Sequence, residues 1–132
     1  MVFVSGTRLH LRSWRFFLPF ILHTQRAARQ ARGAEGNLHM DLYRDRQFGF
    51  WTRTLWRDEA AMRAFMMSGA HAKAMRRHLN WADESYVVHW TQESSDVPSW
   101  AEVSRRMKVE GRATRLRHPS HAHERFEVPE LR

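Results

Sequence analysis

The 132-residue sequence has no cysteine, which excludes disulfide bonds, thiolate catalysis and cysteine-based zinc sites. It also lacks an apolar run that could cross a bilayer, which takes about 20 residues. The only strongly apolar run, FFLPFIL at residues 16–22, is not followed by the small-residue cleavage site of a signal peptide. We therefore expect a cytoplasmic protein without a membrane span.

Lysine is scarce as well, since only two of the 22 basic residues are Lys and the rest are Arg. The formal net charge of +8 leaves nucleic acid, anionic lipid or an acidic substrate open as partners. A high-GC coding bias also produces an Arg-rich, Lys-poor balance, and this is the simpler reading. Six Trp and eight Phe supply the material for a real core, and the length fits one domain.

Hydrophobic periodicity predicts the order of the secondary structure. The alternating segments predict strands over residues 1–11, 37–44, 48–56 and 85–91. The remaining patterns predict helices over residues 14–32, from residue 58 to about 67, over residues 70–79 and over residues 100–110. The order β-α-β-β-α-β predicts an α+β, ferredoxin-like sandwich with an antiparallel sheet.

We expect this domain to occupy residues 1–92. Residues 93–132 would form an additional C-terminal helix and a polar, His- and Arg-rich extension. From residue 112 onward there are few core-type residues. We therefore expect this tail to be disordered or to lie against a partner subunit.

Two strand segments resemble the RNA recognition motif. VFVSGT at residues 2–7 and RQFGFWTR at residues 46–53 are similar to its two signatures, with Phe3, Phe48 and Phe50 as the residues that would stack on bases. The second segment departs from the signature, because Gln47 stands in place of Gly. Nucleic-acid binding is kept as an alternative.

A second resemblance rests on the segment WTRTLWRDEAAMRAFMMSGAH, residues 51–71. It resembles the antibiotic-biosynthesis-monooxygenase-like superfamily, the dimeric α/β-barrel proteins, and in particular its small uncharacterised bacterial members. This resemblance covers residues 1–92. It implies a homodimer whose two sheets pack face to face, and an apolar pocket between helices and sheet in each subunit. It also implies one of several activities, among them cofactor-free oxygenation of polycyclic phenols, haem degradation, and lyase or isomerase reactions.

His71 is the candidate catalytic residue. Its imidazole titrates near neutral pH, so it can move a proton to or from a phenol or an enol. We expect a hydrophobic, aromatic or polyketide-like substrate and no cofactor. The haem-degrading relatives carry their axial His at the position that Met75 occupies here, so haem is only an alternative. His78 is expected near the helix end, in solvent.

The expected substrate-binding residues are aromatic, basic or polarizable side chains on the predicted strands and helices: Trp51, Trp81, His89, Met75, His39, Tyr43 and Arg53. Alternation does not reveal which strand faces line the pocket. The tail sequence HPSHAH at residues 118–123 is dense in imidazoles but lacks a nearby carboxylate at ligand spacing, so we expect no metal site.

Overall fold

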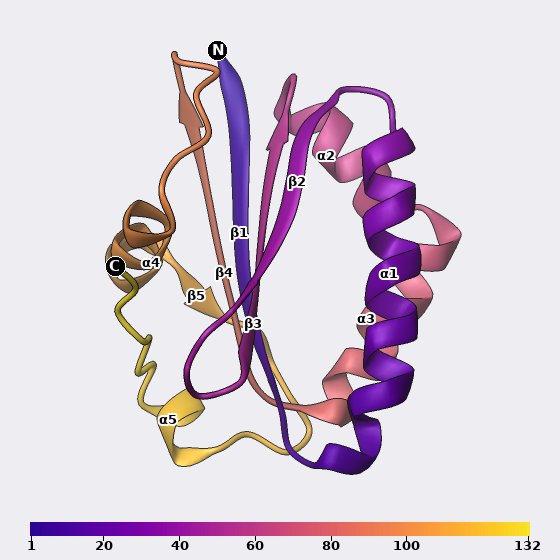
Figure 1. Ribbon diagram of the computed structural model, residues 1–132, viewed down its shortest axis with the longest axis vertical. Coiled ribbons are helices and arrows are strands. Elements are labelled where there is room, and N and C mark those ends of the chain that lie inside the picture. Colours follow the sequence, from indigo (N-terminus) through magenta and orange to yellow (C-terminus); the bar gives the residue numbers. More distant parts are fainter.

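An antiparallel five-stranded sheet forms the centre of the molecule (Figure 1). The computed structural model describes residues 1–132, apart from the side chains of residues 69, 70 and 74. The strand order is β2-β3-β1-β4-β5, and all four pairings are antiparallel. The strands are β1 (Val2–Leu11), β2 (Asn37–Arg44), β3 (Gly49–Trp56), β4 (Ala82–Gln92) and β5 (Arg112–Ala113). The predicted ferredoxin-like α+β fold is confirmed.

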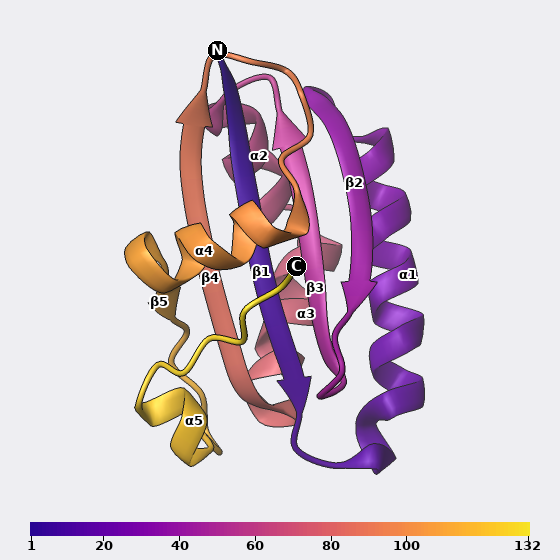
Figure 2. The ribbon, with the colours of Figure 1, turned by 60° about the vertical axis from the view of Figure 1, so that its left-hand side comes forward.

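Helices cover both faces of this sheet. Three lie on one face (Figure 1): α1 (Phe17–Gly33), α2 (Glu59–Met66) and α3 (Gly69–Trp81). On the other face lie α4 (Trp100–Glu110) and the short α5 (His121–Glu124), as Figure 2 shows. None of the described helices is long and apolar enough to cross a membrane.

The start of α1 follows from two residues. Ser13 caps a single 3₁₀ turn, Trp14–Phe16, by accepting a hydrogen bond from the backbone N–H of Arg15. Because α1 itself begins at Phe17, Pro19 falls within its first turn, where the missing N–H has no partner to lose. The helix therefore runs without the interruption that an internal proline would cause.

The C-terminal segment, residues 93–132, packs on the sheet of its own chain. The side chains of Val103 and Met107 on α4, and of Val128 and Leu131 in the tail, are buried against the sheet. Gly6 lets α4 approach closely, since a Cβ there would lie 2.7 Å from Cγ1 of Val103. The expectation of a disordered or partner-bound tail is corrected, because a few widely spaced apolar side chains pack the tail against the sheet of its own chain.

Two of the three aromatic residues that resembled an RNA-binding surface, Phe3 and Phe50, lie on the helix-covered face, whereas Phe48 precedes β3 and is exposed beside Trp14. Phe3 is buried in a cluster with Trp56, and the ring centroid of Phe50 lies 5.0 Å from that of Phe20 on α1. Both side chains lie under α1–α3, whereas base stacking needs aromatics on an open sheet face. The predicted base-stacking surface is therefore wrong.

Candidate active site

A cavity of about 710 Å³ lies between the helix-covered face of the sheet and helices α1, α2 and α3. This volume is in the range of small-molecule sites. Most of the wall is apolar, and it includes Phe20, Ile21, Phe50, Met62, Phe65 and Leu79. From β1 the side chains at alternate positions, Ser5, Thr7 and Leu9, reach the cavity, because successive strand residues point to opposite faces. Arg8, between them, also belongs to the wall, although its guanidinium binds Asp45 and Glu84 on the other face.

His71 lines this cavity from the first turn of α3. Ser68, at the N-cap of α3, donates a hydrogen bond from Oγ to the carbonyl of Phe65 at 2.6 Å, and this holds the α2–α3 junction. The His71 ring packs on Phe65 with centroids 4.6 Å apart. Its Nδ1 is buried and has no hydrogen-bond partner among the described residues.

The electrostatics of His71 favour a neutral ring. Burial lowers the pKa of His71, and the backbone of Met66 acts in the opposite direction without overcoming it. At pH 7 the imidazole is therefore uncharged and has a nitrogen that can accept a proton.

Two more imidazoles line the same cavity. His78 lies two turns after His71 on α3, and its Nε2 is buried without a partner in the described structure. Burial, with smaller contributions from His71 and His23, lowers the pKa of His78 to about 4. The expectation that His78 lies in solvent is corrected, since its seven-residue distance from His71 places both on one helix face.

His89 enters the cavity from β4, and its ring packs on Phe3 with centroids 5.3 Å apart. Burial, and then the charge of Arg112, lowers the pKa of His89. Its Nε2 and the Nε1 of Trp56, a further residue of the wall, are buried and unpartnered within the described structure. A buried polar group without a partner costs about 1–3 kcal/mol, so four such nitrogens beside one cavity make it the candidate ligand site, although each nitrogen is itself covered by protein atoms.

The two tryptophans expected to wall the pocket lie elsewhere. Trp51 is fully buried on the other face of the sheet, where its Nε1 donates to Oδ2 of Asp45 at 2.8 Å. Trp56, five residues later on β3, lies on the cavity side instead. Trp81 packs on Phe16 at the end of α3, in a neighbouring cluster, and is not among the cavity-lining residues.

The polar candidates on β2 and β3 lie on the face of the sheet that α4 covers. Arg53 is held by the carboxylate of Asp41 and stacks over Trp100 of α4 at 4.1 Å, so it does not line the cavity. His39 lies with its Nε2 3.2 Å from Asp41 and is also absent from the wall. Tyr43 contributes to the wall, although its ring stacks on Trp100. Sequence alternation separates the faces of a strand but does not say which one is covered by α4.

The predicted residues that the structure does bring to the cavity are His71, Met75, His89 and Tyr43. Sequence reasoning missed His78 and Trp56. It also missed Arg112 and Arg115, which reach the wall from the C-terminal segment. For His78 the helical spacing was a usable signal, whereas nothing local marks the two arginines.

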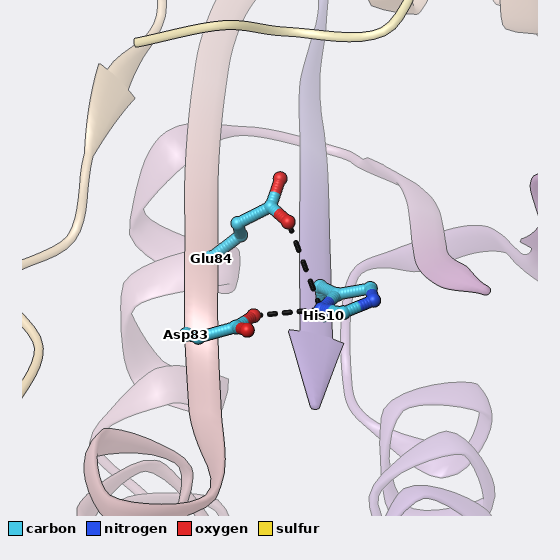
Figure 3. Close-up of side chains that lie close together, drawn as sticks. All are labelled: His10, Asp83 and Glu84. Atoms are coloured by element: carbon cyan, nitrogen blue, oxygen red, sulfur yellow. Dashed lines mark hydrogen bonds and ion pairs between the residues drawn. The ribbon is translucent and has the colours of Figure 1, made fainter. Parts of the chain in front are cut away.

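A second polar cluster lies where β1 ends and β4 begins (Figure 3). A bulge in β4 opposite His10 brings Asp83 and Glu84 toward it: His10 Nδ1 lies 2.6 Å from Oδ1 of Asp83 and 3.6 Å from Oε2 of Glu84. In the described structure this is the one group arranged as a metal ion would require. Arg8, fully buried, also donates to Glu84 and to Asp45, each at 2.8 Å. These charges compensate one another, and Asp83 raises the pKa of His10, so the cluster is accounted for as an ion-pair network.

The fold is similar to that of solved structures described as antibiotic biosynthesis monooxygenases. Solved structures share it: Rv0793 from Mycobacterium tuberculosis is 11% identical with a TM-score of 0.66, and covers 73% of this chain and 100% of its own. SnoaB, a cofactor-independent oxygenase from Streptomyces nogalater, is 18% identical with a TM-score of 0.57, covering 71% and 95%. A further antibiotic biosynthesis monooxygenase is 14% identical with a TM-score of 0.62, covering 71% and 100%. At these identities the similarity shows the fold alone.

The family of this chain is shown by its sequence. The model of the family described as Domain of unknown function (DUF3291) matches residues 20–126, and the chain belongs to that family. No curated protein matches the sequence significantly.

Proposed function

We propose that this protein is a small-molecule enzyme resembling the cofactor-free monooxygenases, and that His71 is its proton acceptor. The substrate would be hydrophobic and aromatic or polyketide-like. The observation that supports this proposal is the apolar cavity around which His71, His78, His89 and Trp56 each leave a ring nitrogen without a partner among the described residues.

The proposed reaction begins with transfer of a proton from a phenol or enol of the substrate to the neutral imidazole of His71. The resulting anion reacts directly with dioxygen at a ring carbon and forms a C–O bond. The proton then returns from the imidazolium, so that the product is a hydroperoxide with the atoms of substrate and dioxygen. His78, His89 and Trp56 would hold the substrate by hydrogen bonds. The description of SnoaB as a cofactor-independent oxygenase supports this choice of chemistry.

Oxygen uptake with a panel of polycyclic phenols tests the proposal. His71→Ala should lower the rate by about 10²–10⁴-fold, the usual range for loss of a general base. The melting temperature should stay nearly unchanged. His121→Ala, in the exposed part of α5, is the matched control and should keep the wild-type rate. A His71→Ala variant that retains activity would overturn the assignment.

Two alternatives have distinct signatures in the same experiment. A lyase or isomerase would convert substrate after the same proton transfer without consuming oxygen. A haem protein would show a Soret band after purification, and the unpartnered imidazoles of His71 and His78 would then be candidate iron ligands.

The homodimer also belongs to this proposal, through a surface other than the sheet face. In this chain α4 and the tail cover the face that would pack against a second sheet, so direct sheet packing requires them to move. Exposed apolar side chains lie instead on two neighbouring elements, with Leu18 and Leu22 on α1 and Leu38 on β2. Figure 2 shows α1 and β2 side by side.

Light scattering after size exclusion should therefore give a dimer for the wild type. Leu18→Glu combined with Leu22→Glu should give a monomer, because the new charges would be buried at the interface. Val109→Glu, an equally exposed apolar position on α4, should leave the dimer intact. A monomeric wild type would contradict the proposed assembly.

A further inference from the structure

The C-terminal segment closes one side of the cavity through residues 112–116, which we call the rim segment. On one side β5 pairs with β4, with Ala113 opposite Tyr86, and the N–H of Thr114 donates to the carbonyl of Ser85 at 2.8 Å. On the other side the N–H of Arg117, directly after the rim segment, donates to the carbonyl of Leu79 on α3 at 3.2 Å. Backbone hydrogen bonds thus fix this wall at both ends.

The rim segment brings two arginines to the cavity. Arg112 is paired with Val87 in the sheet, and Val87 itself lines the cavity, so the side chain of Arg112 lies on the cavity face. Arg115 belongs to the same wall. Both side chains are exposed, and neither forms an ion pair with any residue that the structure describes. Burial lowers the pKa of His89, and the charge of Arg112 acts in the same direction.

The remainder of the wall does not balance this charge. Among the described lining residues there are four arginines and three histidines but no carboxylate. Arg8 is neutralised on the other face by Asp45 and Glu84. In the described part of the chain this leaves Arg44 and the two rim arginines without an ion pair; Arg44 lies on β2, at the opposite edge of the sheet, over the ring of Phe48. The cavity is therefore apolar between the sheet and α1 and carries two cations together at the rim segment, which suits a ligand that is apolar at one end and anionic at the other.

We propose that the substrate is a hydrophobic anion whose carboxylate is bound by Arg112 and Arg115, while its apolar part lies against Phe20 and Phe50. This inference rests on the proposed function and adds the chemical class of the substrate. Guanidinium groups form paired, charge-assisted hydrogen bonds with carboxylates, so both arginines can bind one such group. The C-terminal segment is thus a specificity element of the site.

Two ligands that differ only in charge test this inference on the full-length protein. 9-Anthracenecarboxylate and its neutral amide are titrated by ligand fluorescence against the wild type, Arg112→Gln and Arg115→Gln. Arg105→Gln removes the same charge from an exposed position of α4, on the other face of the sheet, and is the matched control.

We expect the wild type to bind the carboxylate at least tenfold more tightly than the amide. Each rim variant should weaken carboxylate binding about tenfold and change amide binding less than twofold. Arg105→Gln should behave as the wild type, and added salt should reduce the preference because the rim is partly exposed. Equal binding of the two ligands, with no effect of the rim variants, would overturn the inference while leaving the cavity as a ligand site. Absence of binding by either ligand would also overturn it.

Failure of the proposed function has a different signature. The wild type could prefer the carboxylate over the amide, and the rim variants could lose that preference, while no ligand is converted and no oxygen is consumed. This result would support the inference and refute the proposed enzyme activity.

Discussion

Acid should destabilise this protein through His78, the most deeply buried imidazole of the cavity. Burial lowers the pKa of His78 to about 4 in the folded protein, against the ordinary value of 6.5. As the pH falls, the unfolded chain takes up this proton first. The contribution of His78 to folding is therefore intact above pH 6.5 and is lost on acidification toward pH 4.

The difference between the two pKa values corresponds to a loss of about 3 kcal/mol in the free energy of unfolding once the pH is below 4. About 2 kcal/mol of this is lost between pH 7 and pH 5. This is a large share of the free energy of unfolding of a small domain, typically about 5–15 kcal/mol, and so it is measurable by urea unfolding.

The comparison is between the wild type and His78→Leu at pH 7 and pH 5. The stability of the wild type relative to the variant should fall by about 2 kcal/mol on acidification, because leucine keeps the apolar contacts and does not titrate. For His10→Gln the sign is reversed: the stability of the wild type relative to this variant should rise on acidification from pH 7 to pH 5. Asp83 raises the pKa of His10, so its stabilisation is present at low pH and is lost as the pH rises through that value. If the wild type and His78→Leu lose equal stability between pH 7 and pH 5, the burial argument is refuted.

Three further perturbations test the packing, each by urea unfolding or light scattering. Gly6→Ala should lower the free energy of unfolding by about 1–3 kcal/mol, because the new Cβ would lie 2.7 Å from Val103 of α4. Gly33→Ala has no atom within 4 Å of the new Cβ and should change this free energy by less than about 1 kcal/mol. Equal effects of the two substitutions would refute the close approach of α4 to Gly6. Arg8→Met should lower the free energy of unfolding by about 3–5 kcal/mol, since it leaves the buried carboxylate of Asp45 without its cation. An unchanged free energy of unfolding in Arg8→Met would contradict the ion-pair network. Ending the chain at residue 92 tests the predicted division between residues 1–92 and 93–132; the uncovered apolar face should drive self-association, and a stable monomeric fragment would contradict this.

The fold was predictable because its signals are local. Alternation of apolar residues predicted the strand at residues 37–44, and helical periodicity predicted the helix at residues 100–110; both agree with the structure residue for residue. The fourth strand begins three residues before its predicted start, since its first residues, which include Asp83 and Glu84, lack an apolar pattern and form the bulge.

The cavity was only partly predictable because burial on one face or the other is decided by distant segments. Trp51 and Trp56 have similar local sequences, yet one lies under α4 and the other lines the cavity. The C-terminal segment is held by contacts across the sequence, such as the hydrogen bond from the N–H of Ser120 to the carbonyl of Asp83 at 2.9 Å. Such contacts produce no periodicity in the sequence. The packing of α4 and the tail on the sheet, and the position of the rim arginines at the cavity, could therefore not be predicted from the sequence.

The indole N–H of Trp56 gives the most direct test that the cavity binds an aromatic ligand through its unpartnered ring nitrogens. In a ¹⁵N–¹H spectrum the tryptophan indole signals are assigned and followed during titration with 2-naphthol. The Trp56 signal should move to saturation, while those of Trp51 and Trp90, whose indole N–H groups already donate to Asp45 and Gln92, should stay in place. A Trp56 signal that does not move at saturating ligand would contradict the account.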